Sequence, residues 1–263
     1  DEPRAEIVAK LEMLTPGGSL KDRTALGMVL DAEARGILKP GVRLVEATAG
    51  NTGVGLALVA RSRGHEVCLV MPARYSSEKA RLCAALGAEL ARLEGDCAGM
   101  RECLDTARRI EAGGAILLNQ FENAANPAMH ELTTGPEIER QCAGRLDAVV
   151  IGVGTGGTLT GVGRHLRRLH PGIEIIGVES EGSAIGGGLP RRSRVEGIGN
   201  SFVPATLDAS LMSSIVTVAD DDAFGMARRL AQVEGILAGP SSGAVVHAAV
   251  GAARRLGPGR RVV

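Results

Sequence analysis

The chain has 263 residues, 44% hydrophobic and 23% charged, which is the usual balance of a globular protein and excludes disordered and fibrous classes. Thirty Lys and Arg residues balance 30 Asp and Glu residues, and 2% of residues are aromatic, so the composition does not favour binding to nucleic acid. Because no apolar run reaches membrane-spanning length and no signal-peptide pattern opens the chain, we expect a cytoplasmic protein without membrane contact.

Short apolar runs alternate along the chain with stretches of helical spacing. In chain order we predict a helix from near Ser19, strand 42–46, helix 53–62, strand 66–71, helices 77–86 and 100–111, strands 115–119 and 148–153, helix 157–169, strand 173–178, helix 221–234, an Ala- and Val-rich helix after 243 and a strand opening at 260. This alternation predicts an α/β protein whose mostly parallel sheets carry helices on both faces. Residues 119–137, which contain Asn126-Pro127, are the predicted crossing between two α/β units.

The first candidate site begins with Lys21, where a Gly-Gly-Ser turn passes into a helix. A lysine near the positive end of a helix would have the lowered pKa that an amine nucleophile needs. A solvated surface lysine is an equally good interpretation of Lys21 by itself.

A second candidate site is the segment from Thr48 to Gly53, which joins a predicted strand to a predicted helix. Its backbone N–H groups and the hydroxyls of Thr48 and Thr52 would hold a carboxylate at the positive end of the helix. An ordinary helix cap explains the same residues.

The third candidate site is the glycine-rich turn from Gly152 to Thr158. Its glycines would let the backbone approach a phosphate, and Thr155 and Thr158 would add hydroxyl donors. The turn also satisfies G-x-G-x-x-G, with Glu179 at the end of the next strand, so an NAD-dependent dehydrogenase stays an alternative at this point.

The remaining polar signals are weaker. Ser241 and Ser242 precede the last helix, where either would serve as a cap. Five cysteines without CxxC spacing indicate free thiols, and five histidines without ligand spacing predict no metal site.

Together the motifs resemble the cysteine synthase and cystathionine β-synthase family of fold-type II pyridoxal-phosphate (PLP) enzymes. The resemblance covers essentially the whole chain. The matching segments are Pro16 to Arg23, Thr48 to Gly53, Asn119 to Phe121, Thr134 to Glu137, Gly154 to Thr158, Glu196 to Gly199 and Gly239 to Gly243.

The resemblance implies PLP as cofactor, held by Lys21 as a Schiff base, with Asn51 at the ring hydroxyl and Ser241 at the pyridine nitrogen. The residues implied to bind the phosphate are Gly154, Thr155, Gly156, Gly157 and Thr158. The residues implied to bind the substrate are Thr48, Ala49, Thr52, Gln120 and Gly197. Ala49 departs from the family, in which serine is commoner at this position.

The family's fold is two three-layer α/β/α domains with mostly parallel sheets, similar to the tryptophan synthase β subunit. We therefore expect a smaller, mobile substrate-loop domain at residues 23–127 and a larger PLP-binding domain made of residues 1–22 and 128–263. The resemblance also implies a homodimer, and family strands before Val8 and after Val263 that lie outside this sequence.

The implied activity is β-replacement, which forms L-cysteine from O-acetylserine, or a related activated serine, and sulfide through an aminoacrylate. Cystathionine β-synthesis from serine and homocysteine is the alternative within the family. Two hypotheses of other classes stay open: a non-catalytic regulatory binding protein with the same fold, and the dehydrogenase, which does not account for Lys21 or Ser241.

Overall fold

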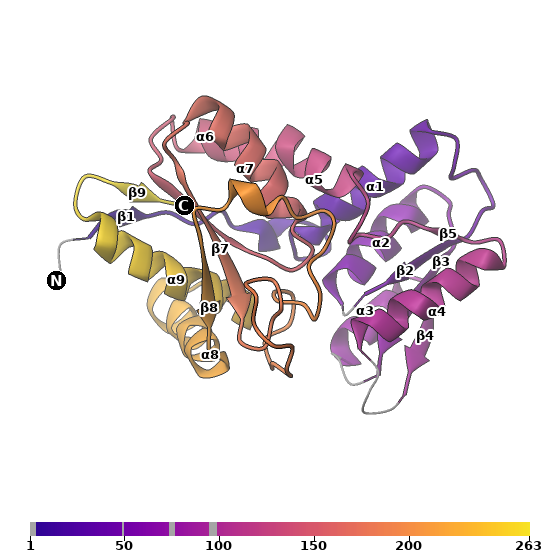
Figure 1. Cartoon of the computed structure of the whole chain (residues 1–263). Coiled ribbons are helices and arrows are strands. Elements are labelled where there is room, and N and C mark those ends of the chain that lie inside the picture. The colour runs from indigo at the N-terminus through magenta and orange to yellow at the C-terminus, as the bar shows by residue number, and fades with distance from the viewer. Residues whose placement is uncertain (1–3, 49, 74–76, 95–98) are drawn as a thin grey trace. The chain divides into compact units, whose positions relative to one another are not determined.

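Two separate parallel sheets organise the chain. Figure 1 shows the computed structural model, which describes residues 4–48, 50–73, 77–94 and 99–263. Contacts divide the chain into a smaller unit, Glu12–Asn126, and a larger unit made of Asp1–Leu11 and Pro127–Val263. The expected mobile domain at residues 23–127 stays a prediction, because these units describe contacts and not motion.

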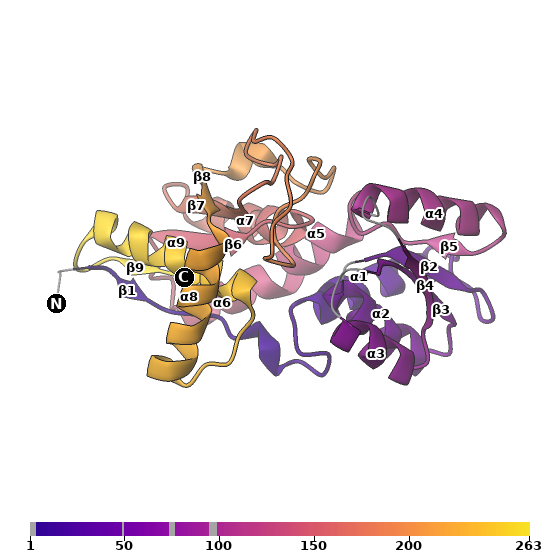
Figure 2. The same cartoon turned by 90° about the horizontal axis from the view of Figure 1, so that it is seen from below.

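The smaller unit has a four-stranded sheet in the order β4-β3-β2-β5, with every described pair parallel. Its strands are β2 (Leu44–Ala47), β3 (Val67–Pro72), β4 (Glu89–Leu93) and β5 (Ile116–Leu117). Its helices are the 3₁₀-helix η1 (Glu12–Leu14), α1 (Lys21–Ala34), α2 (Asn51–Ser62), α3 (Ser77–Ala85) and α4 (Met100–Ala112). Figure 2 shows α4 on one face of this sheet and α1, α2 and α3 on the other.

The core of the smaller unit lies between its sheet and α1, α2 and α3. Leu44 and Leu69 from the strands pack in one buried cluster with Met28 of α1 and Leu56 of α2. Burial of each such side chain contributes roughly 1.5–3 kcal/mol. The cluster therefore fixes the starts of α1 and α2 relative to the carboxyl end of β2, which is where the lysine turn and the Thr48 segment lie.

The larger unit has a five-stranded parallel sheet in the order β1-β9-β6-β7-β8. Its strands are β1 (Glu6–Ile7), β6 (Ala148–Gly152), β7 (Glu174–Ser180), β8 (Ser214–Val218) and β9 (Arg261–Val262). Its helical segments are the π-helix η2 (His130–Thr134), α6 (Gly135–Gln141), α7 (Gly157–Leu169), the 3₁₀-helix η3 (Ala209–Leu211), α8 (Asp220–Arg229), the π-helix η4 (Leu230–Glu234) and α9 (Pro240–Leu256). A short helix, α5 (Ala125–Met129), contains the junction between the two units.

Helices cover both faces of the larger sheet, α8 and α9 on one and α6 and α7 on the other (Figure 1). The alternation along β6 explains the two layers. Ala148 and Val150 join the cluster under α8 and α9, whereas Val149 and Ile151 join the cluster under α6 and α7. Since both faces are buried, β6 is a continuous apolar run, as expected for a central parallel strand.

The predicted elements are present with limits shifted by a few residues. Predicted strand 115–119 shortens to β5, and predicted helix 221–234 becomes α8 followed by η4, which ends at Gly235 with a left-handed φ of 68°. Strand β1 (Glu6–Ile7) was not predicted, and because it pairs with β9 within this sequence, the expectation that the strand before Val8 lies outside the sequence is wrong. Strands β4 and β8, which also lie at sheet edges, were not predicted either. Both contain exposed as well as partly buried residues, so neither forms the continuous apolar run that marked the central strands.

Two general expectations can be compared with the structure. In the part of the chain described, Cys68, Cys83, Cys103 and Cys142 form no disulfide with one another, and Cys97 lies outside it. None of the described helices combines the length and apolar character required to cross a membrane.

Candidate active site

Lys21 is the first residue of α1, and a hydrogen-bonded turn holds it in place. The hydroxyl of Ser19 accepts the Lys21 backbone N–H at 3.3 Å, and the hydroxyl of Thr15 donates to the Ser19 carbonyl at 2.9 Å. The carboxylate of Asp22 accepts the Gly17 N–H at 2.6 Å. The Ser19 bond satisfies one of the orphan N–H groups of the helix start, and the other two bonds stabilise the turn that precedes Lys21.

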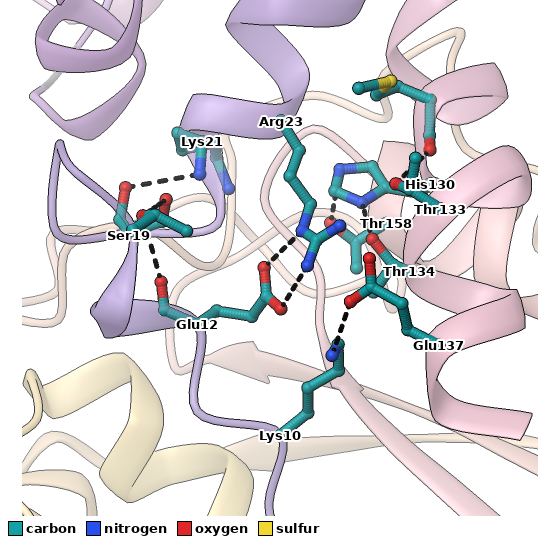
Figure 3. A network of polar contacts seen from close by, with 12 residues as sticks. Lys10, Glu12, Ser19, Lys21, Arg23, His130, Thr133, Thr134, Glu137 and Thr158 are labelled. Carbon is teal, nitrogen blue, oxygen red and sulfur yellow. Dashed lines mark hydrogen bonds and ion pairs between the residues drawn. The ribbon is translucent and has the colours of Figure 1, made fainter. Parts of the chain in front are cut away.

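An ion pair on the same helix start ties the turn to the preceding segment. The Arg23 guanidinium donates two hydrogen bonds to the Glu12 carboxylate, at 2.7 and 3.1 Å (Figure 3). Such bidentate pairs fix geometry as well as charge. The first turn of α1 is therefore restrained on both sides of Lys21.

The amine of Lys21 differs from that of an ordinary surface lysine. Burial of the amine, and secondarily the charge of Lys79, lower the pKa of Lys21 to about 8. Both effects penalise the ammonium form. Roughly a tenth of Lys21 is therefore a neutral nucleophile at pH 7, far more than of an ordinary lysine.

The predicted substrate residues of the smaller unit form a buried hydrogen-bonded group. The Thr52 hydroxyl donates to Gln120 Oε1 at 2.7 Å, and Gln120 Nε2 donates to the Ala47 carbonyl at 2.9 Å. The Thr48 hydroxyl accepts the Gly50 N–H at 3.1 Å. Thr48, Thr52 and Gln120 are all buried, so their positions are well defined.

Two further predicted residues follow the same strand. Asn51 is the first residue of α2 and is half-buried. Ala49 lies outside the described residues. The carbon chain of Lys79 passes against Gly50, where a Cβ atom would overlap it. The side chain of Lys79 therefore lies beside Gly50, immediately before the start of α2.

Glu46 is a polar residue of this unit that was not predicted from the sequence. It lies in β2 with 1% of its surface exposed, and its Oε1 accepts the Gln120 backbone N–H at 3.3 Å. Burial raises the pKa of Glu46 to about 8, against the opposing effect of hydrogen bonds led by that from Gln120. The one sequence signal was a carboxylate within the apolar run Leu44-Val45-Glu46-Ala47.

In the larger unit, the predicted phosphate loop follows β6 and enters α7. A Cβ atom on Gly154 would lie 2.6 Å from the Gly197 carbonyl oxygen, and one on Gly156 would lie 2.5 Å from Leu207 Cβ. Gly156 also has a φ of 85°. Only glycine meets these constraints, and the result is a loop whose backbone can closely approach a ligand at the positive end of a 13-residue helix. Within the loop, the Gly157 N–H donates to the Thr155 hydroxyl at 3.4 Å.

Side chains of the larger unit support the threonines of this loop. The Thr206 hydroxyl donates to the Thr155 carbonyl at 2.5 Å. The buried His130 ring lies between Thr134 and Thr158, with its nitrogens 2.9 and 3.3 Å from their hydroxyl oxygens (Figure 3). Both contacts restrain the loop from outside it.

Gly197 and Ser241 lie beside the same loop. A Cβ atom on Gly197, whose φ is 91°, would lie 3.7 Å from the Ser241 hydroxyl oxygen. The Gly199 N–H donates to the Val153 carbonyl at 2.7 Å. The structure therefore brings Gly154, Gly197 and Ser241 together at the carboxyl end of β6, next to the starts of α7 and α9.

Glu179 was the acid that the dehydrogenase hypothesis required for a ribose. It is 2% exposed. Its two carboxylate oxygens accept hydrogen bonds from the Thr217 hydroxyl at 2.9 Å and the Gly186 N–H at 3.0 Å. A carboxylate that is buried and bonded in this way is not available to a ribose.

Comparison with known proteins decides the family. The sequence model of the family described as pyridoxal-phosphate dependent enzyme matches residues 1–263. The chain belongs to this family. Cysteine synthase of Staphylococcus aureus (strain Mu50 / ATCC 700699) is 46% identical over 266 residues, which cover 100% of this chain and 86% of that protein. Cysteine synthase A of Escherichia coli (strain K12) is 44% identical over 256 residues, 93% of this chain and 79% of that protein.

A solved structure agrees with this assignment. The O-acetylserine dependent cystathionine beta-synthase from Helicobacter pylori matches with a TM-score of 0.95 and 37% identity, over 99% of this chain and 86% of that one. The predicted family and the fold-type II architecture are confirmed. The chain is a PLP-dependent enzyme similar to cysteine synthases.

The residues of this PLP-dependent enzyme fit the cofactor's chemistry. An amine with a lowered pKa is suited to covalent attachment to an aldehyde, and backbone N–H groups at the start of a helix are suited to binding a phosphate. Lys21 provides the amine, and the loop that begins at Gly154 provides the backbone N–H groups at a helix start. The individual roles of the residues in PLP binding stay predictions.

The lowered pKa of Lys21 predicts how the apoprotein takes up PLP. The neutral amine is the nucleophile, so the rate constant of uptake should rise with pH and level off above about pH 8. Stopped-flow absorbance measures it. Lys79→Met should move the midpoint to higher pH, because it removes a charge that lowers the pKa of Lys21. A wild-type profile still rising at pH 10 would show an ordinary lysine.

Proposed function

We propose that this enzyme forms L-cysteine from O-acetylserine, or a related activated serine, and sulfide by replacing the β-substituent. The observation that carries the proposal is the 46% identity to a cysteine synthase over the whole chain. Lys21 supports it, since its amine has the lowered pKa that the chemistry requires.

In this proposal the glycine-rich loop after β6 and Ser241 bind the cofactor. The backbone N–H groups from Gly154 to Thr158 hold the phosphate, and the Ser241 hydroxyl contacts the pyridine nitrogen. Bound PLP supplies an electron sink that makes the α-proton of an amino acid acidic. A neutral hydroxyl at the pyridine nitrogen gives a weaker sink than a carboxylate, which favours β-elimination over transamination.

Lys21 provides the reactive amine, and a set of polar and small residues binds the substrate. Lys21 holds the cofactor covalently, and its released amine removes the α-proton and later returns it. Asn51 contacts the cofactor's ring hydroxyl. Thr48, Thr52 and Gln120 bind the substrate carboxylate, for which their buried hydrogen-bonded arrangement is suited. Ala49 and Gly197 complete the proposed substrate set.

The overall reaction balances without an oxidant or reductant. The α-proton moves to Lys21 Nζ, and acetate leaves with the electron pair of the Cβ–O bond. Hydrosulfide then adds to Cβ and a proton returns to the α-carbon. The products are L-cysteine and acetate.

Cystathionine synthesis is the second candidate. The Helicobacter pylori structure, named for O-acetylserine dependent cystathionine synthesis, matches with a TM-score of 0.95. In this second candidate homocysteine, rather than sulfide, is the acceptor. The leaving group would be the same, so only the second half of the reaction separates the two candidates.

Substrate tests on the PLP-loaded protein separate these functions. O-acetylserine is added alone and acetate release is measured; sulfide or homocysteine is then added and the product identified by mass spectrometry. Cysteine as the main product supports the proposal, and cystathionine supports the second candidate. A protein that binds PLP but releases no acetate, phosphate or water from the corresponding serine substrates would be a binding protein, and the proposal would be wrong.

A further inference from the structure

Glu46 is a buried carboxyl group to which the proposed chemistry assigns no part. Its Oε2 is inaccessible to solvent and has no hydrogen-bond partner among the described residues. Its Oε1 contacts the backbone N–H of Gln120 at 3.3 Å. A buried polar atom without a partner carries a desolvation cost, so its retention next to Gln120 calls for an explanation.

Gln120 links Glu46 to the proposed carboxylate-binding residues. Gln120 Oε1 accepts the Thr52 hydroxyl at 2.7 Å, and its Nε2 donates one hydrogen to Ala47 O at 2.9 Å. The carbonyl of Gln120 accepts a further hydrogen bond from Asn126 Nδ2 at 2.8 Å. The Nε2 group of Gln120 has two hydrogens. One of them donates to the Ala47 carbonyl, so the other is able to donate to a ligand.

The charge state of Glu46 would affect any anion that Gln120 binds. A carboxylate in a poorly solvated region repels another anion strongly, because screening by water is weak there. Its raised pKa of about 8 means that Glu46 is mainly uncharged at pH 7 and mainly charged at pH 9.5. Burial disfavours the carboxylate form of Glu46. As the pH rises through its pKa, the charged fraction of Glu46 increases, and its repulsion of a bound anion increases with it.

The elements around β2 carry other ionisable groups that must be separated from Glu46. On β3 its register partner is the apolar Leu69. The ionisable groups on α1, α3, β3 and α4 that are buried or half-buried are Lys21, Asp22, Arg23, Asp31, Glu33, Cys68, Lys79, Cys83 and Cys103. All of them are retained when Glu46 alone is changed, so a comparison of variants at equal pH cancels their titration.

We propose that Glu46 is a positioning residue for the substrate carboxylate: it holds Gln120 through the backbone N–H and must be uncharged for the carboxylate to bind. The proposal rests on the proposed function, which assigns that carboxylate to Gln120 and Thr52. It adds that substrate affinity falls at high pH because a residue of the protein, and not the cofactor, becomes charged.

The test measures binding without turnover. The PLP-loaded enzyme is titrated with L-serine, and with L-serinamide, which lacks the carboxylate, by the change in cofactor absorbance at pH 7 and pH 9.5. Glu46→Gln keeps the acceptor oxygen but cannot ionise, and Glu46→Met removes the acceptor as well. Glu122→Gln is the matched control, an exposed glutamate of the same unit.

Affinity for L-serine should be nearly equal in wild type and Glu46→Gln at pH 7, and about 30-fold higher in Glu46→Gln at pH 9.5, where only a small fraction of Glu46 is uncharged. Glu46→Met should bind about fivefold more weakly than Glu46→Gln at both pH values, because the Gln120 N–H loses its acceptor. L-serinamide should show no pH-dependent difference between wild type and Glu46→Gln. Glu122→Gln should follow wild type throughout.

The role of Glu46 is overturned if the ratio of the affinities of wild type and Glu46→Gln for L-serine is the same at pH 7 and pH 9.5. It is also overturned if the ratio for L-serinamide changes with pH as much as the ratio for L-serine. If Glu46→Gln fails to fold, the pH dependence of Glu46→Met relative to wild type makes the same decision. Acetate release from O-acetylserine by the wild type at pH 7 tests the proposed function separately, so the two failures are distinguishable.

Discussion

Replacing Lys21 with alanine is expected to remove the visible absorbance of covalently bound PLP and to lower turnover with O-acetylserine by about 10³-fold or more. The variant loses both the attachment point and the base that moves the α-proton. The half-buried Lys21 has a pKa of about 8 because of burial and the charge of Lys79. An absorption spectrum of the PLP-treated variant and an assay of acetate release measure the two losses.

Lys39→Ala is the matched control, because Lys39 is an exposed lysine of the same unit. It should keep both the absorbance and the turnover. Lys79→Ala gives a sharper comparison, since Lys79 is a second cation beside the Thr48 segment. If Lys79→Ala lost the absorbance and Lys21→Ala kept it, the assignment of the attachment point would be wrong.

The central strands and the helices between them could be predicted because their signal is local. β2, β3, β6 and β7 are almost entirely buried, so each is a run of apolar residues that ends in a glycine-bearing or polar turn. The edge strands β4 and β8 mix exposed and partly buried positions, and the exposed charged residues Glu89 and Arg92 interrupt β4, so neither strand shows a continuous apolar run or a regular alternation. Edge position depends on the whole sheet and cannot be seen in a short window.

The candidate site shows the same division between local and long-range information. The motifs at Lys21, Thr48 and Gly154 were visible because each is a contiguous turn before a helix. Glu46 was missed because its significance depends on Gln120, which lies 74 positions away. The support of Thr155 by Thr206 spans 51 positions. Contacts of this kind arise from the fold and leave no short pattern in the sequence.

Gly154→Ala is expected to give the second large effect, a loss of PLP affinity of about 100-fold. The added Cβ would lie 2.6 Å from the Gly197 carbonyl oxygen and 3.4 Å from the carbon of that carbonyl. Both contacts are with backbone, so no side-chain rotation relieves them. The loop or the Gly197 segment must move, which displaces the N–H groups proposed to hold the phosphate.

Overpacking of this kind also destabilises the fold by roughly 1–3 kcal/mol, so affinity and stability must be measured separately. Fluorescence titration with PLP gives the affinity, and urea unfolding of the apoprotein gives the free energy of unfolding. Gly251→Ala is the control: it lies exposed within α9, and its Cβ would meet no atom within 4 Å. Alanine there should raise stability by up to about 1 kcal/mol and leave PLP affinity unchanged. If Gly154→Ala lost stability but kept its PLP affinity, the close approach of Gly154 to Gly197 would serve packing alone, and the phosphate would have to bind elsewhere.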